Sequence, residues 1–227
     1  ASQERGIQEF PFSYQASRHE RGWLLSSLGG FYEHHWFEDV LRMVKGGKEA
    51  SVYLCRTGAD APFNAQPAAQ ERLPGPEQSV KDHLLAAKVY RPRMFRNLRN
   101  DALYREGRTV LDEDGHEIFD GRMKRAMRHK TSYGLELMHT AWLEHEFTTL
   151  QVLYEAGADV PKPFTSNHNA ILMSYVGDED LAAPTLFSIR LRRAEVKPLF
   201  ERVLRNIEIM LAPERIHGDL SAFNILY

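Results

Sequence analysis

The stretch IHGDLSAFNILY, residues 216–227, places Asp219 five positions before Asn224 and follows both with a short apolar run. Phosphoryl transfer needs a carboxylate that orients the accepting hydroxyl and an amide oxygen that holds a divalent metal on the phosphates. An Asp and an Asn on one tight loop can direct both groups into one cleft. The apolar run 225–227 predicts a buried strand that anchors the loop. The same spacing also fits an Asp N-cap followed by a solvated Asn in a turn.

The composition indicates a globular chain without a disulfide framework. Hydrophobic residues make up 43% and charged residues 26% of the 227 residues, enough apolar material for one large or two small domains. The formal net charge of −2 gives no global basic field that would demand nucleic acid. Cys55 is the only cysteine, which suits a reducing compartment. The sequence shows no apolar run of transmembrane length and no signal-peptide core, so we expect a cytoplasmic protein without a membrane partner.

Residues 36–176 are predicted to form a β-rich lobe with one helix. A glycine turn at 45–50 joins two β-rich runs as a hairpin. Two long loop insertions are expected, at 57–82 and 91–139. The remaining predicted elements of this lobe are a strand over 83–90, an amphipathic helix over 140–156, and short strands over 160–164 and 170–176.

Different segments flank this lobe. Residues 1–35 are expected to form an arm, poorly ordered as far as residue 16, and then a short helix that a Gly-Gly pair breaks. Residues 177–227 are predicted to begin a mostly helical second lobe. This order of elements is that of an α+β, bilobal, protein-kinase-like fold. The second amphipathic helix predicted in the chain covers 188–211, in the second lobe. It carries a strong apolar stripe of Val196, Leu199, Phe200, Val203, Ile207 and Met210.

Lys88 lies in an otherwise apolar predicted strand. An ammonium group there is costly unless it reaches a carboxylate, a phosphate or water. Glu146 lies on or beside the apolar stripe of the predicted helix, next to Phe147. We therefore predict an ion pair between Lys88 and Glu146, of the kind that fixes a lysine against nucleotide phosphates. The alternatives are a lysine that extends to solvent and a glutamate that faces water at the edge of the stripe.

The glycine turn and the residues before Asp219 allow further interpretations. Backbone N–H groups of the turn 45–50 can face phosphate oxygens, although a plain hairpin explains its glycines equally well. Gly218 stands where ordinary protein kinases carry an Arg that pairs with a phosphorylated activation loop, so we expect no activation of that kind. His217 is expected to shape the loop rather than to act as a base.

Five segments, in family order between residues 36 and 227, together resemble the RIO family of atypical serine/threonine protein kinases. The resemblance is to the branch without an N-terminal winged helix. The pattern G-K-E-A-x-V-Y combined with H-G-D-L-S-x-x-N is more specific than any single motif. The segments are GKEASVY (47–53), AKVYR (87–91), WLEHEF (142–147), AGADVPKP (156–163) and IHGDLSAFNIL (216–226).

The resemblance implies a role for each matched position. Lys88 would bind the α- and β-phosphates of ATP, and Glu146 would brace it. Asp219 would be the catalytic carboxylate and Asn224 a ligand of Mg²⁺. The other implied ATP contacts are Met173 beside the adenine, the hinge from Ser174 to Val176, and the turn residues Gly47, Lys48, Glu49, Ala50, Ser51 and Val52.

The implied function is that of an ATP- and Mg²⁺-dependent RIO-type serine/threonine kinase or ATPase in the maturation of the small ribosomal subunit. The basic clusters of insertion 91–139 would contact ribosomal RNA or the subunit, unless they form a solvated charged loop. Two rivals stay open: a non-catalytic, nucleotide-gated RNA- or protein-binding module, and a small-molecule kinase of the aminoglycoside or choline type, against which the G-K-E-A-x-V-Y turn argues. The family's second metal-binding Asp is absent up to Tyr227, so we expect a reduced C-lobe and a truncated view of a longer chain.

Overall fold

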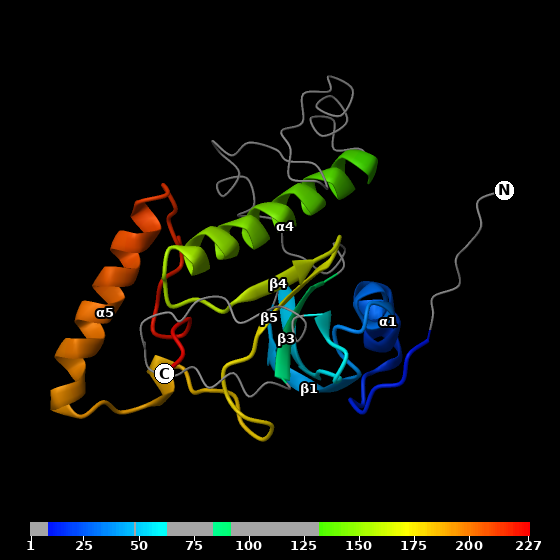
Figure 1. Ribbon diagram of the computed structural model, residues 1–227, viewed down its shortest axis with the longest axis horizontal. Coiled ribbons are helices and arrows are strands. Elements are labelled where there is room, and N and C mark those ends of the chain that lie inside the picture. The colour runs from blue at the N-terminus through cyan, green and yellow to red at the C-terminus, as the bar shows by residue number, and fades with distance from the viewer. Residues whose placement is uncertain (1–8, 48, 63–83, 92–131) are drawn as a thin grey trace.

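The computed structural model describes residues 9–47, 49–62, 84–91 and 132–227 (Figure 1). The expected insertion 91–139 therefore lies largely outside the described residues, as does most of 57–82. The elements are α1 (Arg18–Glu33), β1 (Asp39–Gly46), β2 (Ala50–Arg56), β3 (Leu84–Tyr90), α4 (Ser132–Glu155), β4 (Pro163–Ser166), β5 (Ala170–Ser174), the short 3₁₀ helix η4 (Leu186–Ser188) and α5 (Arg193–Leu211).

The five strands form one antiparallel sheet in the order β1-β2-β3-β5-β4. The predicted hairpin of β1 and β2 is present, and so is the predicted pair of short strands β4 and β5. Strand β3 lies at the centre, where Lys88 pairs with Val52 on one side and Ile171 on the other. A central strand cannot slip without disturbing both neighbours, so the position of Lys88 is fixed by the whole sheet.

The two faces of the sheet are covered by different helices. Along β3, Leu85, Ala87 and Val89 pack in the core that includes α1 and the buried Cys55 of β2. The alternate residues Ala86 and Tyr90 pack in a second core that includes Leu143 of α4. Because side chains alternate along a strand, Lys88 shares the face of Ala86 and Tyr90. The sheet therefore presents Lys88 toward α4.

Helix α1 is longer than expected and the segment before it is packed. Its N-cap is Ser17, whose hydroxyl accepts a hydrogen bond from the Glu20 N–H, and the helix passes through the Gly-Gly pair to Glu33. The predicted break there is wrong, because Phe31 beyond the glycines is buried against the sheet and offsets their low helix propensity. The predicted poor order is also wrong for residues 9–16, since Phe10 is 1% exposed.

Helix α4 begins at Ser132, eight residues before the predicted start. The end of the expected insertion is thus helical. Residues 135–138 are Leu-Glu-Leu-Met, all good helix formers, and the interleaved charges just before them hid this start. None of the helices in the described ranges is both long and apolar enough to cross a bilayer.

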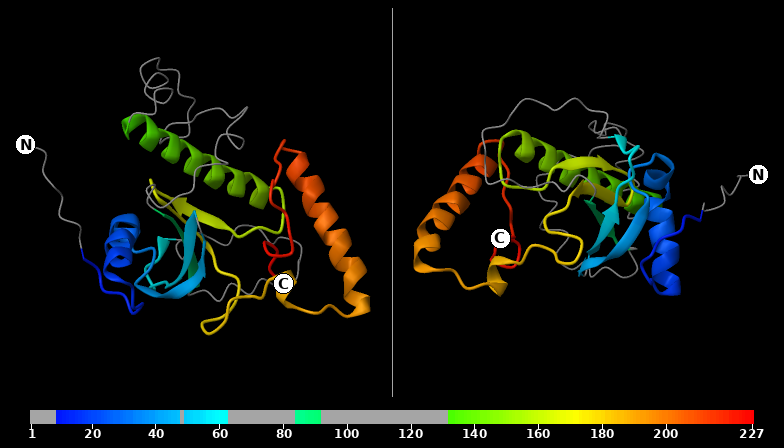
Figure 2. Two further views of the ribbon diagram at one scale, coloured as in Figure 1. Left: turned by 180° about the vertical axis from the view of Figure 1, so that it is seen from behind. Right: turned by 60° about the horizontal axis from the view of Figure 1, so that its bottom comes forward.

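Helix α5 lies at the far side of the sheet from α1, and the C-terminal segment runs between α5 and the sheet (Figures 1 and 2). It starts at Arg193, five residues later than predicted, after a 3₁₀ turn. Its stripe is only partly covered: Val196 is 50% exposed and Phe200 60%, while Met210 is buried. The other three residues of the stripe are intermediate in exposure. Apolar periodicity predicts the helix but not its partner. Among the described residues only the C-terminal end of the stripe, at Met210, packs in an apolar cluster, with Leu153 of α4 and Ala158.

The predicted buried strand at 225–227 is also wrong. This segment forms a single β-bridge between Leu226 and Thr185, and the Tyr227 N–H donates to the Pro184 carbonyl at 2.9 Å. The Leu226 and Tyr227 side chains are about half exposed, at 47% and 50%. The bridge anchors the loop to the segment before η4, and the Leu186 and Phe187 N–H groups of η4 donate to the Ile225 and Ala222 carbonyls at 2.8 and 3.0 Å. In the described part of the chain no further strand pairs with it.

Candidate functional site

The predicted ion pair between Lys88 and Glu146 is present, and it joins β3 to α4. The Lys88 and Glu146 side chains are 30% and 25% exposed, so the pair is neither buried nor free in water. The ammonium group also lies 5.3 Å from the centre of the Tyr90 ring. A half-buried cation held by one carboxylate keeps donors available to an anionic ligand, because Lys has three N–H groups.

The glycine turn lies next to this pair in the sheet. A Cβ on Gly47 would lie 2.7 Å from the Ala50 carbonyl oxygen, so the turn requires glycine there. After the turn, Ala50 and Val52 pack in the same cluster as Leu143 of α4, whereas Ser51 is buried. The Glu49 carbonyl accepts a hydrogen bond from the Arg91 N–H at 2.8 Å. Of the predicted nucleotide contacts in this turn, Lys48 lies outside the described residues.

The expected hinge follows β5 and continues into a tight loop. Met173 is 8% exposed and belongs to the same core as Ala50 and Val52. Ser174 is occupied, since its N–H donates to the Lys162 carbonyl and its hydroxyl accepts from the Lys162 N–H. The Val176 carbonyl accepts from the Ala183 N–H at 3.0 Å. Among the described residues the Val176 N–H makes no such bond, which leaves it available as a donor.

Arg42 on β1 ties this hinge to the sheet. Its guanidinium donates to the Tyr175 hydroxyl at 3.0 Å and to the Glu179 carbonyl at 3.2 Å. The loop between them turns at Gly177, whose φ is +141° and whose Cβ would lie 2.5 Å from the Leu181 carbonyl oxygen. Sequence analysis missed Arg42, because a contact across more than 130 positions leaves no local pattern.

The loop of Asp219 and Asn224 closes on itself. The Asn224 amide Nδ2 donates to the Asp219 carboxylate and to its carbonyl, both at 2.9 Å. Gly218 before them has a φ of +74°, and His217 Nδ1 accepts from the Asp219 N–H at 3.3 Å, so His217 shapes the loop as expected. Phe223 in the loop stacks on Phe187 with ring centres 4.0 Å apart.

The structure thus brings the predicted residues together as two pairs. Lys88 meets Glu146 in the sheet region, and Asp219 meets Asn224 in the C-terminal loop. No hydrogen bond or ion pair between described residues joins one pair to the other. Asn224 uses its nitrogen on Asp219, so its oxygen and the carboxylate are hard donors of the kind Mg²⁺ takes, usually with phosphate and water. In the described ranges no three His, Cys, Asp or Glu side chains gather as a metal site.

The chain is similar to kinases of one family. It is 32% identical to human serine/threonine-protein kinase RIO1 over 91 residues, 40% of this chain and 16% of that protein. It is 26% identical over 185 residues to RIO-type serine/threonine-protein kinase Rio1 of Haloferax volcanii, covering 81% of this chain and 49% of that one. The Rio2 relative of Methanocaldococcus jannaschii is 33% identical over 132 residues, 52% of this chain and 48% of that protein. The chain thus spans half or less of the length of these relatives.

The fold is similar to that of a solved Rio2 kinase from Chaetomium thermophilum. The TM-score is 0.51 at 17% sequence identity, over 91% of this chain and 46% of that one. This likeness confirms the predicted α+β, kinase-like fold. A family model described as the RIO domain matches residues 102–227, more than half of the chain. The chain belongs to the RIO domain family.

Proposed function

We propose that this chain binds ATP with Mg²⁺ and acts as a RIO-type serine/threonine kinase or ATPase. The observation that carries the proposal is the Lys88–Glu146 ion pair, formed on the sheet face that also gathers Ala50, Val52 and Met173. The relatives named above are serine/threonine-protein kinases, and the similar Rio2 structure is described as an ADP/Mg²⁺-phosphoaspartate complex.

The sheet region would bind the nucleotide. Lys88 would donate to the α- and β-phosphate oxygens while Glu146 holds its ammonium in place. The Val176 N–H would donate to the adenine edge, and Met173 would pack beside the base. Val52, with Ala50, supplies the apolar surface on the other side. The backbone of the turn Gly47 to Ala50 would lie over the phosphates, and Lys48 and Glu49 belong to the same proposed contact.

The C-terminal loop would act on the acceptor. Asp219 would orient a hydroxyl or a water for in-line attack and accept its proton. The Asn224 nitrogen already fixes the Asp219 carboxylate, and its oxygen would serve as a ligand of Mg²⁺. The bound ion would neutralise phosphate charge. The proposal thus gives the two residues separable roles.

The test compares Asp219→Asn, Asn224→Ala and a matched control, Asp180→Asn, at an exposed aspartate outside the loop. Calorimetry measures ATP affinity with and without Mg²⁺, and ADP release measures turnover. We expect Asp219→Asn to bind ATP normally and to lose turnover by roughly 10² to 10⁴-fold, the usual worth of a general base. Asn224→Ala should weaken Mg²⁺-dependent binding as well. Unchanged turnover in Asp219→Asn would contradict a kinase or ATPase.

The partner is proposed from the sequence alone. The basic clusters of insertion 91–139 support contact with ribosomal RNA or a small ribosomal subunit. Binding through Lys and Arg to phosphates weakens steeply as salt rises, because counterions are released. Affinity for ribosomal RNA that is equal at low and high salt would remove this part of the proposal.

A further inference from the structure

We propose that Asn169, in the turn between β4 and β5, is a positioning residue that fixes α4 against β3 and so keeps Glu146 opposite Lys88. The inference rests on the proposed role of that ion pair in nucleotide binding. Neither the sequence motifs nor the site described above includes Asn169. Its contacts reach α1, β3 and α4, three elements that are far apart in the chain.

The Asn169 side chain uses both of its polar ends. Its Nδ2 donates to the Tyr90 carbonyl at 3.0 Å and to the Ser27 hydroxyl of α1 at 2.7 Å. Its Oδ1 lies 3.1 Å from His139 Nε2 on α4. Its backbone carbonyl also accepts from the Tyr90 N–H at 3.0 Å. One asparagine thus binds the end of β3 through backbone and side chain while it contacts a helix on either side.

The turn itself is built to hold this side chain. Asn167 Oδ1 accepts from the N–H groups of Asn169 and Ala170, at 2.9 and 2.8 Å, and its Nδ2 donates to the Ser27 carbonyl. Trp23 of α1 adds a hydrogen bond from its indole nitrogen to the Tyr90 carbonyl at 2.9 Å. Helix α1 therefore braces the end of β3 and the turn together.

The contacts of Asn169 lie close to the ion pair on both elements. Tyr90 is two residues beyond Lys88 in β3, and His139 precedes Glu146 by seven residues, about two helical turns, in α4. The Tyr90 ring meets the Trp142 ring edge-on at 4.9 Å, and the His139 ring stacks on Trp142. Helix α4 is thus fixed to β3 at two places, at the ring contacts of His139 and Trp142 and at the ion pair of Glu146. The two helical turns between His139 and Glu146 form a stiff segment. A displacement at His139 would move Glu146.

The first test measures the ion pair without any nucleotide. The full chain is treated with a water-soluble acylating reagent, and the rate of Lys88 modification is followed by peptide mass spectrometry. Glu146→Gln sets the rate of an unpaired Lys88. We expect Asn169→Leu to raise the Lys88 rate several-fold toward that value, because its carboxylate partner is no longer held in place. The control is His168→Ala, an exposed residue of the same turn, which should label at the wild-type rate.

The second test separates positioning from general stability. ATP affinity is measured for Asn169→Leu, Glu146→Gln and the double variant. We expect each single change to lower the affinity for ATP by about fivefold, which is the contribution of one hydrogen bond. The double variant should be no weaker than Glu146→Gln alone, since Asn169 acts through Glu146. Independent losses that multiply in the double variant would overturn the proposal, as would a Lys88 labelling rate in Asn169→Leu equal to that of His168→Ala.

A milder variant covers the case in which Asn169→Leu does not fold. His139→Phe keeps an aromatic ring against Trp142 and removes the contact with Asn169. It should raise Lys88 labelling in the same direction, and a wild-type rate in this variant would count against the inference. If the wild-type chain binds no ATP, the proposed nucleotide function fails, while the labelling comparison still decides whether Asn169 positions the pair.

Discussion

Helices α4 and α5 are both amphipathic, yet they are held in opposite ways. Leu143 of α4 is fully buried against the sheet, whereas Phe200 and Leu211 of α5 are 60% and 56% exposed. A small apolar cluster holds the end of α5 at Met210, and the middle of the helix is fixed by polar contacts. The Arg202 guanidinium donates to both Asp159 oxygens, at 2.6 and 2.7 Å. Asn206 adds a hydrogen bond to the same carboxylate. The difference teaches that an apolar stripe predicts a helix, while its surroundings decide what the stripe contributes.

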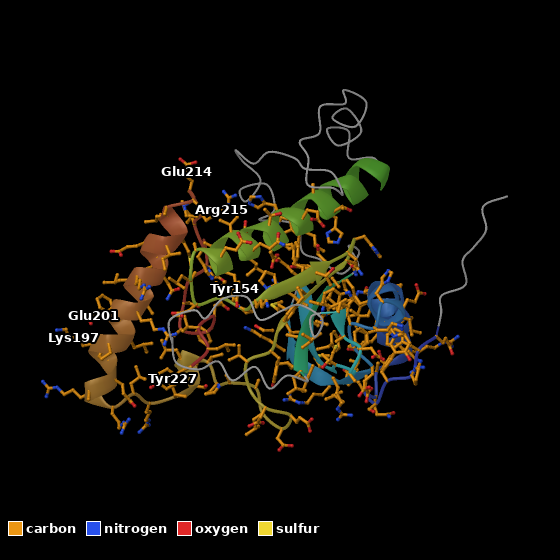
Figure 3. All side chains as sticks on the ribbon, in the orientation of Figure 1. Tyr154, Lys197, Glu201, Glu214, Arg215 and Tyr227 are labelled. Carbon is orange, nitrogen blue, oxygen red and sulfur yellow. The ribbon has the colours of Figure 1, made fainter. Side chains whose placement is uncertain are left out.

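Figure 3 shows two charged side chains on the outer side of α5. Lys197 and Glu201 lie on the side of α5 that faces away from the sheet, where their charged groups approach to 3.8 Å. Such an exposed i,i+4 pair stabilises a helix by about 0.3–0.5 kcal/mol. The region 177–227 therefore depends on polar contacts of small energy and on one small apolar cluster at Met210, and the region before it on two larger apolar cores.

The largest effect is expected from a truncation in α4. Leu143→Ala removes a fully buried side chain from the core beneath Tyr90 and Met173, and should lower the free energy of unfolding by about 3 kcal/mol. Urea unfolding followed by circular dichroism measures it. A loss below about 1 kcal/mol would mean that this core is much less tightly packed than its burial indicates.

An intermediate and pH-dependent effect is expected at Asp159. Hydrogen bonds from Arg202 lower the pKa of this carboxyl, with burial opposing them and Asn206 adding to them. A lowered folded-state pKa means that the stabilisation is present above the unfolded pKa and is lost as pH falls through the folded one. Both side chains are about 40% exposed, so we expect Asp159→Asn to cost only about 0.5–1 kcal/mol near neutral pH.

Hydrogen exchange of the α5 amides measures this change. The difference between wild type and Asp159→Asn should shrink below about pH 4, where the wild-type carboxyl begins to take up its proton. Glu179→Gln, at an exposed and weakly paired carboxylate, is the control and should show little difference at any pH. A difference that grows in acid would contradict a lowered pKa at Asp159.

The smallest effect is expected from the same truncation on α5. Leu211→Ala repeats the change made at Leu143 on a side chain that is 56% exposed, and should alter the free energy of unfolding by less than about 0.5 kcal/mol. The two variants form a matched pair, measured in the same urea experiment. Equal losses would show that the apolar side chain of Leu211 is covered in solution and would end the contrast between the two helices.

Some features of the fold and of the candidate site could be predicted from local sequence patterns. The Lys88–Glu146 pair was predictable, because a lysine in an apolar strand and a glutamate beside an apolar stripe each need a partner. The Asp219–Asn224 loop was predictable from spacing, since the two residues are only five positions apart. The pairing of β1 with β2 and of β4 with β5 was predictable from the short turns between them.

Other features depend on contacts that no local pattern records. The passage of α1 through its two glycines depends on the burial of Phe31 against the sheet, and the hinge depends on Arg42, more than 130 positions away. Asn169 reads as an ordinary turn residue in the sequence, and only the fold places Ser27, Tyr90 and His139 around it. Long-range polar contacts of this kind were the main omission.

Cys55, the only cysteine of the chain, has a consequence for experiments in solution. It is completely buried in β2 among the residues packed under α1, and burial raises the pKa of its thiol. Only an exposed thiolate can attack the sulfur of a disulfide reagent, so native molecules should react only after this core opens. The rate of the reaction then measures how often the core under α1 opens. It does not depend on local unfolding of α5. The reactivity of Cys55 can therefore measure local opening in the β-rich region without any added label.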